Sequence, residues 1–519
     1  MRQLRPTASP PPPSSRHPDR NLSRLAGSAG LMFVGGWIAY ALSTLFQIAI
    51  ARNIGAEQFG AYIVAVGIAW VLAQIAPLGM GWAVVRYLAI YRSQSDQERL
   101  LGTVWLAVRT TTAGGMVLGA GMFLAAPLLA DNVFHQPRAV LLLRLLSLTV
   151  PLSALTDLLL AAVQAYTRVI PTVVVRSVAV PFLRLFGALG ALAIFGGAAF
   201  TVACGYLAAE AIALLLAIVA AMRVLPRGRA RHPGRQVARY ARPLAAQRAL
   251  ESSTADFGDL VLAASHSVNL VALFTAVLRF TEVANALFKA IGVAIAPMVS
   301  DIHTAEQRDH LARLYKAASR WMIMIGVPLF LVQLLFGRWL LGLFGEEFKV
   351  AYSALVIVAV GQFANYCTGV TVDVIRMIGR SGLLLANTVF DVASYVTLNL
   401  VLVPRYGLIG AALAAAIELA SINFVRAVEV WIIARLHPYS RSFAKPLLAA
   451  LGAIVAAWTV RRLPLPSALS ELVALLAMGV AYLGVLAALR LDPDDRVVFK
   501  RLLGRLRNGN GRHAPASGG

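Results

Sequence analysis

Charged side chains interrupt long apolar runs at several places in the chain, and these residues could do chemistry. An ionisable group in the middle of such a run costs roughly 2.5–3.5 kcal/mol to place in hydrocarbon, so it needs a partner or a water-filled site. Asp256 and Asp259 are three residues apart and share one face of a predicted helix. On the next predicted helix, Arg279, Glu282 and Lys289 lie within an arc of about 80°, taken at about 100° per residue.

The basic members of this set predict a site for an anion. Arg184, near the middle of an apolar run, and Lys289 have no obvious partner on their own helices, so we expect both to face a cavity that attracts negative charge. Arg279 has two interpretations. It could face the same cavity, or it could be neutralised locally by Glu282, which lies three residues away. The two aspartates either balance the bases or bind a coupling cation, and the sequence leaves both roles open.

The composition indicates that these charges lie inside a membrane. The chain has 519 residues, of which 59% are hydrophobic and only 14% charged, and its mean hydropathy is +0.73. A soluble domain needs far more polar surface than this. The two cysteines, Cys204 and Cys367, both fall inside apolar runs, so a disulfide framework or a cysteine metal site is not expected.

Fourteen apolar stretches are each long enough to cross about 30 Å of hydrocarbon. We therefore predict an all-α polytopic membrane protein with about fourteen transmembrane helices. The predicted spans are 25–51, 61–88, 101–127, 139–165, 172–196, 200–222, 244–265, 270–298, 318–343, 350–376, 381–403, 407–434, 444–462 and 467–489.

Lysine and arginine are distributed unequally between the two sides of these spans. With the N-terminus inside, thirty-four of the 47 basic residues fall on the cytoplasmic side and seven outside. Cytoplasmic loops carry such an excess, so we expect both termini to be cytoplasmic in a multi-pass membrane protein.

A shift of about 213 residues lays the first six spans onto spans seven to twelve, which predicts two six-helix lobes in parallel orientation plus two extra helices. Repeats of this kind bind substrate between the halves. The predicted division is a disordered basic tail 1–24, an N-lobe 25–222, a basic linker 223–243, a C-lobe 244–435, two extra helices within 444–489 and a basic tail 490–519.

The linker, RVLPRGRARHPGRQVARYARP, contains seven arginines and no acidic residue. Its position between spans six and seven explains this charge as a signal for cytoplasmic orientation and as a contact for anionic lipid headgroups. The linker lacks interleaved aromatic residues and any known binding module, so no nucleic-acid partner is expected even though the net charge is +23.

Several motifs for enzymatic chemistry are absent from the sequence. There is no GK dipeptide and hence no Walker A loop, and neither HExxH nor GxSxG occurs. Glu346 and Glu347 form the one acidic pair in the outer loops, and a pair in a loop is usually only solvated. We therefore expect a transporter without a cofactor or metal and not an enzyme.

Four segments resemble signatures of the polysaccharide and O-antigen flippases, a family of the multidrug/oligosaccharidyl-lipid/polysaccharide exporter superfamily. They occur in family order, although SHSVNLVALF at 265–274 departs from the usual glycine and tyrosine pattern. The segments are ARNIGAEQFGAYIVAVGI (51–68), APMVSDIH (296–303), FGEEFKVAYSAL (344–355) and VPRYGLIGAALAAAI (403–417).

The resemblance implies a two-lobed transporter that moves lipid-linked oligosaccharide, carried on polyprenyl diphosphate, to the outer leaflet of the cell inner membrane by alternating access. It implies a cationic central cavity, coupling to H⁺, Na⁺ or the membrane potential, and polysaccharide polymerase or glycosyltransferase partners. Asp259 and Arg279 match the positions of an acid and a base in family members. A basic cavity formed by Arg184, Arg279 and Lys289 also suits a diphosphate, because guanidinium groups match phosphate oxygens.

Three alternatives stay open. A multidrug exporter of the same superfamily would have acids rather than bases in its first lobe. A membrane glycan polymerase or ligase would need larger outer loops. A scaffold would recruit glycosyltransferases through the basic linker.

Overall fold

The computed structural model describes most of the chain, and Lys289 and the segment 296–303 lie outside the described residues. All regular elements in the described part are helical. The described residues are 18–134, 137, 139–166, 172–226, 228–231, 235–282, 305–377, 381–439, 441–464 and 466–489.

The first half of the chain forms a group of helices that we call the N-terminal group. Its members are α1 (Pro18–Ile75), α2 (Met80–Ser93), α3 (Gln97–Leu129), the π-helical turn η1 (Ala130–Phe134), α4 (Ala139–Ser147), α5 (Thr149–Ala165), the π-helical turn η2 (Val174–Ala179), α7 (Val180–Phe195) and α8 (Ala199–Val224).

The second half begins with α9 (Arg235–Ala255). The helices that follow, apart from the last two, are called the C-terminal group. This group comprises α10 (Phe257–Ser265), a helix over 268–282, α12 (Ala305–Gly342), the 3-10 turn η3 (Glu346–Ala351), α13 (Tyr352–Thr368), α14 (Thr371–Met377) and α15 (Ser381–Ala434). A short turn η4 (Arg441–Phe443) precedes the final pair, α16 (Ala444–Arg461) and α17 (Ser467–Ala488).

Ten helical stretches in the described part are long and apolar enough to cross a membrane. Two of them, Gly35–Ser93 and Gly382–Ile433, have 59 and 52 residues, enough for two crossings each. The prediction of an all-helical polytopic membrane protein is therefore confirmed. The count of fourteen stays a prediction, because α9 with α10 and the helix that starts at 268 are not among the ten.

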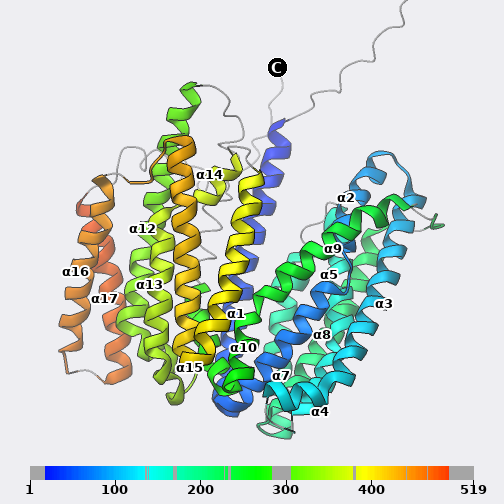
Figure 1. Ribbon diagram of the computed structural model, residues 1–519, viewed down its shortest axis with the longest axis horizontal. Helices are drawn as coiled ribbons and strands as arrows, with labels where there is room; N and C mark the ends of the chain where they lie inside the picture. Colours follow the sequence, from blue (N-terminus) through cyan, green and yellow to red (C-terminus); the bar gives the residue numbers. More distant parts are fainter. Residues whose placement is uncertain are drawn as a thin grey trace, which may run out of the picture.

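The two longest helices reverse direction at a glycine (Figure 1). Gly55 inside α1 has φ 77° and Gly407 inside α15 has φ 55°, a region that side chains with a Cβ rarely adopt. Gly196, between α7 and α8, has φ 88° and precedes Gly407 by 211 residues (407 minus 196). This spacing is close to the shift of about 213 residues from which the sequence predicts a repeat, so it supports the two-lobe proposal.

The N-terminal and C-terminal groups approach each other at one end and diverge toward the other (Figure 1). At the end where they converge, one buried apolar cluster contains side chains from both groups, including Phe59, Phe344 and Phe348. Gly60 of α1 lies so close to the helix over 268–282 that a Cβ built on it would be 1.8 Å from the Val268 carbonyl oxygen. The groups are thus packed backbone to backbone at this end.

Helix α9 packs against α1 and α2. The Ala241 carbonyl oxygen would lie 2.1 Å from a Cβ on Gly79, and the Tyr240 ring packs against that of Tyr87. Helix α10 instead packs against α15. The chain therefore passes from the N-terminal group to the C-terminal group at the break between α9 and α10, where Asp256 lies.

Close packing inside the N-terminal group can be tested at a glycine. A Cβ on Gly205 of α8 would lie 2.5 Å from the Gly187 carbonyl oxygen of α7, which cannot move without the helix. We expect Gly205→Ala to cost about 1–3 kcal/mol of stability, measured as a lower thermal unfolding temperature in detergent. The matched control is Gly190→Ala on α7, where a Cβ would meet nothing within 4 Å. Equal unfolding temperatures for the two variants would contradict this packing.

Candidate functional site

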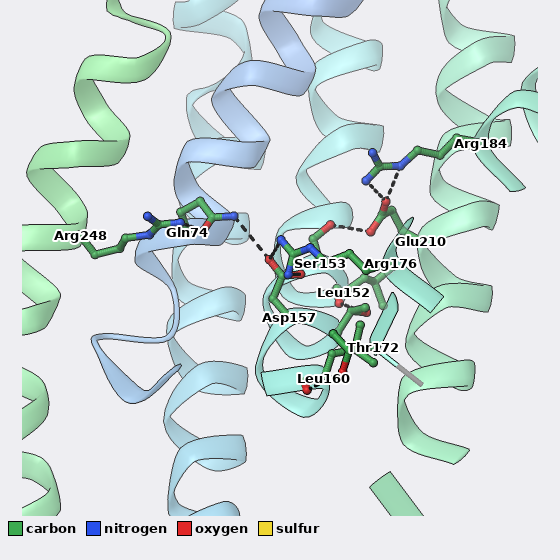
Figure 2. Close-up of polar contacts among 11 residues, drawn as sticks. Gln74, Leu152, Ser153, Asp157, Leu160, Thr172, Arg176, Arg184, Glu210 and Arg248 are labelled. Carbon is green, nitrogen blue, oxygen red and sulfur yellow. Dashed lines mark hydrogen bonds and ion pairs between the residues drawn. The ribbon is translucent and has the colours of Figure 1, made fainter. Parts of the chain in front are cut away.

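Arg184 on α7 forms an ion pair with Glu210 on α8, the neighbouring helix. Its Nε donates to Glu210 Oε1 at 2.9 Å, and Nη2 donates to the same oxygen. Ser153 on α5 donates to the other carboxylate oxygen at 2.8 Å (Figure 2). The Glu210 side chain is only 3% exposed and that of Arg184 30%. Glu210 is thus the buried, fully engaged partner, while the arginine keeps part of its surface accessible.

The guanidinium of Arg184 also stacks on an aromatic ring. Its central carbon lies 4.5 Å from the ring centroid of Tyr206, which in turn packs edge-on against Tyr62. Such a cation–π contact stabilises a desolvated charge further. The partner of Arg184 comes from α8, and the expectation that Arg184 faces a cavity for an anion stays a prediction. Glu210 itself is a mid-span acid in the sequence, but helix periodicity does not reveal which helices touch.

A second polar network connects α9 with the N-terminal group. Arg176 of η2 bonds to Asp157 of α5 at 2.8 Å. Gln74 of α1 donates to the same carboxylate at 3.5 Å and accepts from Arg248 of α9 at 2.5 Å (Figure 2). The sequence analysis did not predict this network, because its members come from four elements far apart in the chain.

Arg279 lies where the helix over 268–282 meets α1. Its Nη1 is 2.9 Å from Glu282, so the local ion pair, one of the two interpretations of Arg279, is present. Its Nε donates to Gln47 Oε1 at 2.6 Å, and the Tyr40 hydroxyl donates to its main-chain carbonyl. The Arg279 side chain is 25% exposed and that of Glu282 48%. Arg279 therefore connects the two groups of helices while retaining access from outside the protein core.

The two aspartates of the predicted site lie at the start of α10. Asp256 occupies the break between α9 and α10 and lies against Gly67 of α1. A Cβ built on that glycine would be 3.3 Å from one Asp256 carboxylate oxygen. Asp259 is in the first turn of α10. Residue 258, between them, donates its backbone N–H to the Tyr395 hydroxyl of α15 at 3.3 Å. The pair thus lies between α1 and α15, while Lys289 lies outside the described residues.

A further group of charges is formed by the two halves of α15. Arg426 is 3.6 Å from Asp391, and the Glu418 carboxyl group lies near that of Asp391. Asn387 donates to Glu429 at 2.7 Å. Across the described ranges, no three His, Cys, Asp or Glu side chains gather in a group that could hold a metal ion.

The described helices and the ion pairs between them are those of a polytopic membrane protein with charges paired in its interior. A family model described as polysaccharide biosynthesis protein matches residues 25–303. This match covers more than half of the chain, so the chain belongs to that family. The MatE family model matches residues 243–404.

Known proteins resemble parts of the chain. A probable low-salt glycan biosynthesis flippase, Agl15 of Haloferax volcanii, is 24% identical over 143 residues, which are 27% of this chain. The matched region spans only 30% of that relative's length.

Two solved structures share the fold. The lipid II flippase MurJ in an inward closed conformation has a TM-score of 0.66 at 15% identity, covering 92% of this chain and all of that chain. An inward-facing multidrug resistance MATE transporter has a TM-score of 0.63 at 16% identity, covering 76% of this chain and 94% of that chain.

The Arg184–Glu210 pair predicts an asymmetric stability effect. Glu210→Gln leaves a largely desolvated cation without its anion, and breaking a buried pair in this way typically costs about 3–5 kcal/mol. We expect the double variant Arg184→Gln/Glu210→Gln to recover much of that loss. The measurement is thermal unfolding of the purified variants, with the half-exposed Glu251→Gln as control. An additive loss in the double variant would contradict the pairing.

Proposed function

We propose that the protein is a flippase that translocates oligosaccharide linked to polyprenyl diphosphate across the inner membrane for polysaccharide biosynthesis. The observation that carries this proposal is the family match over residues 25–303. The similarity to Agl15 supports the glycan part of the proposal. The relatives are flippases and transporters, so the proposed activity is transport and not catalysis.

The headgroup of such a substrate carries a diphosphate, and Arg184, Arg279 and Lys289 are the residues proposed to hold it. The contacts of Arg184 with Glu210 use its Nε and Nη2, and those of Arg279 with Gln47 and Glu282 use its Nε and Nη1. Within the described part of the chain, these contacts leave one terminal nitrogen of each guanidinium for a phosphate oxygen. An arginine oriented by an acid is well suited to this, because less side-chain freedom is lost on binding.

The acids proposed for charge balance or coupling are Asp256, Asp259 and Glu282. Glu282 already balances Arg279. Asp256 and Asp259 lie between helices of the two groups, so a proton or Na⁺ bound there would favour one arrangement of the groups over the other. Moving one such elementary charge across the whole membrane would change its energy by about 2.3 kcal/mol per 100 mV of membrane potential.

The proposed topology follows the distribution of basic residues. Both termini and the linker over 223–243 are cytoplasmic, and the two lobes over 25–222 and 244–435 alternate access between leaflets. The reversals at Gly55, Gly196 and Gly407 then lie at the outer face.

A multidrug exporter is the second candidate, because the MatE model matches residues 243–404. The two candidates differ in the charge of the transported group. The first-half acids Asp157 and Glu210 are both paired with arginines, which leaves little net negative charge for a drug cation. This observation favours the anionic, lipid-linked substrate.

Leaflet exchange of a lipid-diphosphate oligosaccharide in proteoliposomes tests the proposed function. Exchange should depend on the protein and respond to an imposed membrane potential. Absence of exchange together with transport of cationic dyes would move the protein to the exporter candidate.

The site assignment predicts that single substitutions of the interior bases slow this exchange. We expect Arg279→Ala, Arg184→Ala and Lys289→Ala each to reduce the rate by about tenfold or more, since a charged hydrogen-bonded contact is worth about 1.5–3 kcal/mol. Arg235→Ala, at the exposed start of α9, is the control and should leave the rate unchanged. Wild-type exchange rates in all three interior variants, at equal incorporation, would refute the assignment.

A further inference from the structure

Two parts of the chain 291 residues apart meet where the N-terminal and C-terminal groups converge. The backbone N–H of Ala56, in α1, donates to the carboxylate oxygen Oε1 of Glu347, in η3, at 2.7 Å. The donor belongs to the N-terminal group and the acceptor to the C-terminal group. The bond therefore exists only while the groups are closed at this end.

The local sequence explains why Ala56 needs an acceptor from elsewhere. Gly55, with φ 77° and ψ 166°, interrupts α1, so a new helical segment begins at Ala56. The first N–H groups of a helix lack intrahelical acceptors, and the preceding side chain normally supplies one. A glycine has no side chain to do so. The carboxylate of Glu347 supplies the acceptor and also interacts favourably with the positive end of the helix dipole.

The cap is surrounded by apolar and polar contacts between the same two groups. The Phe59 ring packs against Phe344 and Phe348, with centroids 6.5 and 6.3 Å apart, and all three residues are fully buried. Arg52 Nη2 donates to the Gly342 carbonyl oxygen at 3.4 Å. The closed end is thus sealed by aromatic rings, and the cap lies beside that seal.

The neighbouring glutamate behaves differently. Glu346 bonds to Lys349 on the same turn at 2.7 Å, and its side chain is 85% exposed. Its contacts stay within the C-terminal group, so opening and closing would not change them. Among the described residues, Glu347 thus contacts the N-terminal group, whereas its neighbour Glu346 contacts its own group.

We propose that Glu347 is a gating residue, whose carboxylate caps the second segment of α1 and so favours closure of the groups at this end. In a state open at this end, the Ala56 N–H and the Glu347 carboxylate would each bond to water instead of to each other. The cap therefore stabilises the closed state selectively. Each transport cycle would break and remake this bond. The proposal concerns alternating access itself and holds whichever substrate is carried.

Spin-label distance measurements in lipid nanodiscs test this role. Cys204 and Cys367 are replaced by serine, and one label pair is placed across the closed end with Asn53→Cys and Val350→Cys, both exposed positions. A second pair, Gln94→Cys and His437→Cys, lies just beyond the ends of α2 and α15, at the end where the groups diverge (Figure 1).

We expect Glu347→Ala to lower the ratio of closed to open molecules roughly fivefold, the usual effect of removing a helix cap. The first label pair should gain a longer distance while the second pair gains a shorter one. Glu347→Gln, which keeps an acceptor but no charge, should give an intermediate shift, and it carries the test if the alanine variant does not fold. Glu346→Ala is the matched control and should give the unsubstituted distribution.

Coinciding distributions for the Glu347 and Glu346 variants would overturn the proposal. A change in the first pair without the reciprocal change in the second would also overturn it, because that pattern indicates local loosening and not a shift between two states. Neither measurement needs a substrate, so failure of the gate and failure of the proposed flippase activity can be told apart.

Discussion

An ionised side chain within hydrocarbon must find an opposite charge, hydrogen-bonding partners or water, and the interior of this protein is organised by that constraint. Glu210 is nearly inaccessible and is bonded by both Arg184 and Ser153. Asp157 likewise has partners from two other elements. These contacts join helices that apolar packing alone would not position uniquely, because lipid tails are as apolar as the helix surfaces. Charge pairing thus specifies the N-terminal group as well as providing its candidate binding groups.

The same principle separates what the sequence predicts from what it does not. The all-helical class and most spans follow from apolar length. The need for partners follows from charges such as Arg184. The identity of a partner does not follow, because Glu210 is 26 residues away on another helix and periodicity describes only one helix at a time. Glu347 was expected to be solvated as part of a loop pair, and it instead accepts a hydrogen bond from the other group of helices. Only the tertiary structure reveals that Gly55 creates an uncapped helix start beside it.

Two of the segments that carry the family resemblance pack against each other. Phe59, from the segment over 51–68, packs against Phe344 and Phe348, from the segment over 344–355. A Cβ built on Gly407, in the segment over 403–417, would lie within 3.4 Å of side-chain atoms of His266 and Leu270. These residues form the converging end of the two groups. Two of the segments that resemble the family therefore contribute side chains to the packing at the converging end.

The most direct measurement is a structure of the protein in nanodiscs with a bound lipid-diphosphate oligosaccharide. The central claim, that interior arginines oriented by acids hold the anionic headgroup, predicts diphosphate density in contact with the guanidinium groups of Arg279 and Arg184. Density confined to the exposed arginines of the linker, with both interior guanidiniums bonded only to their acid partners, would contradict it.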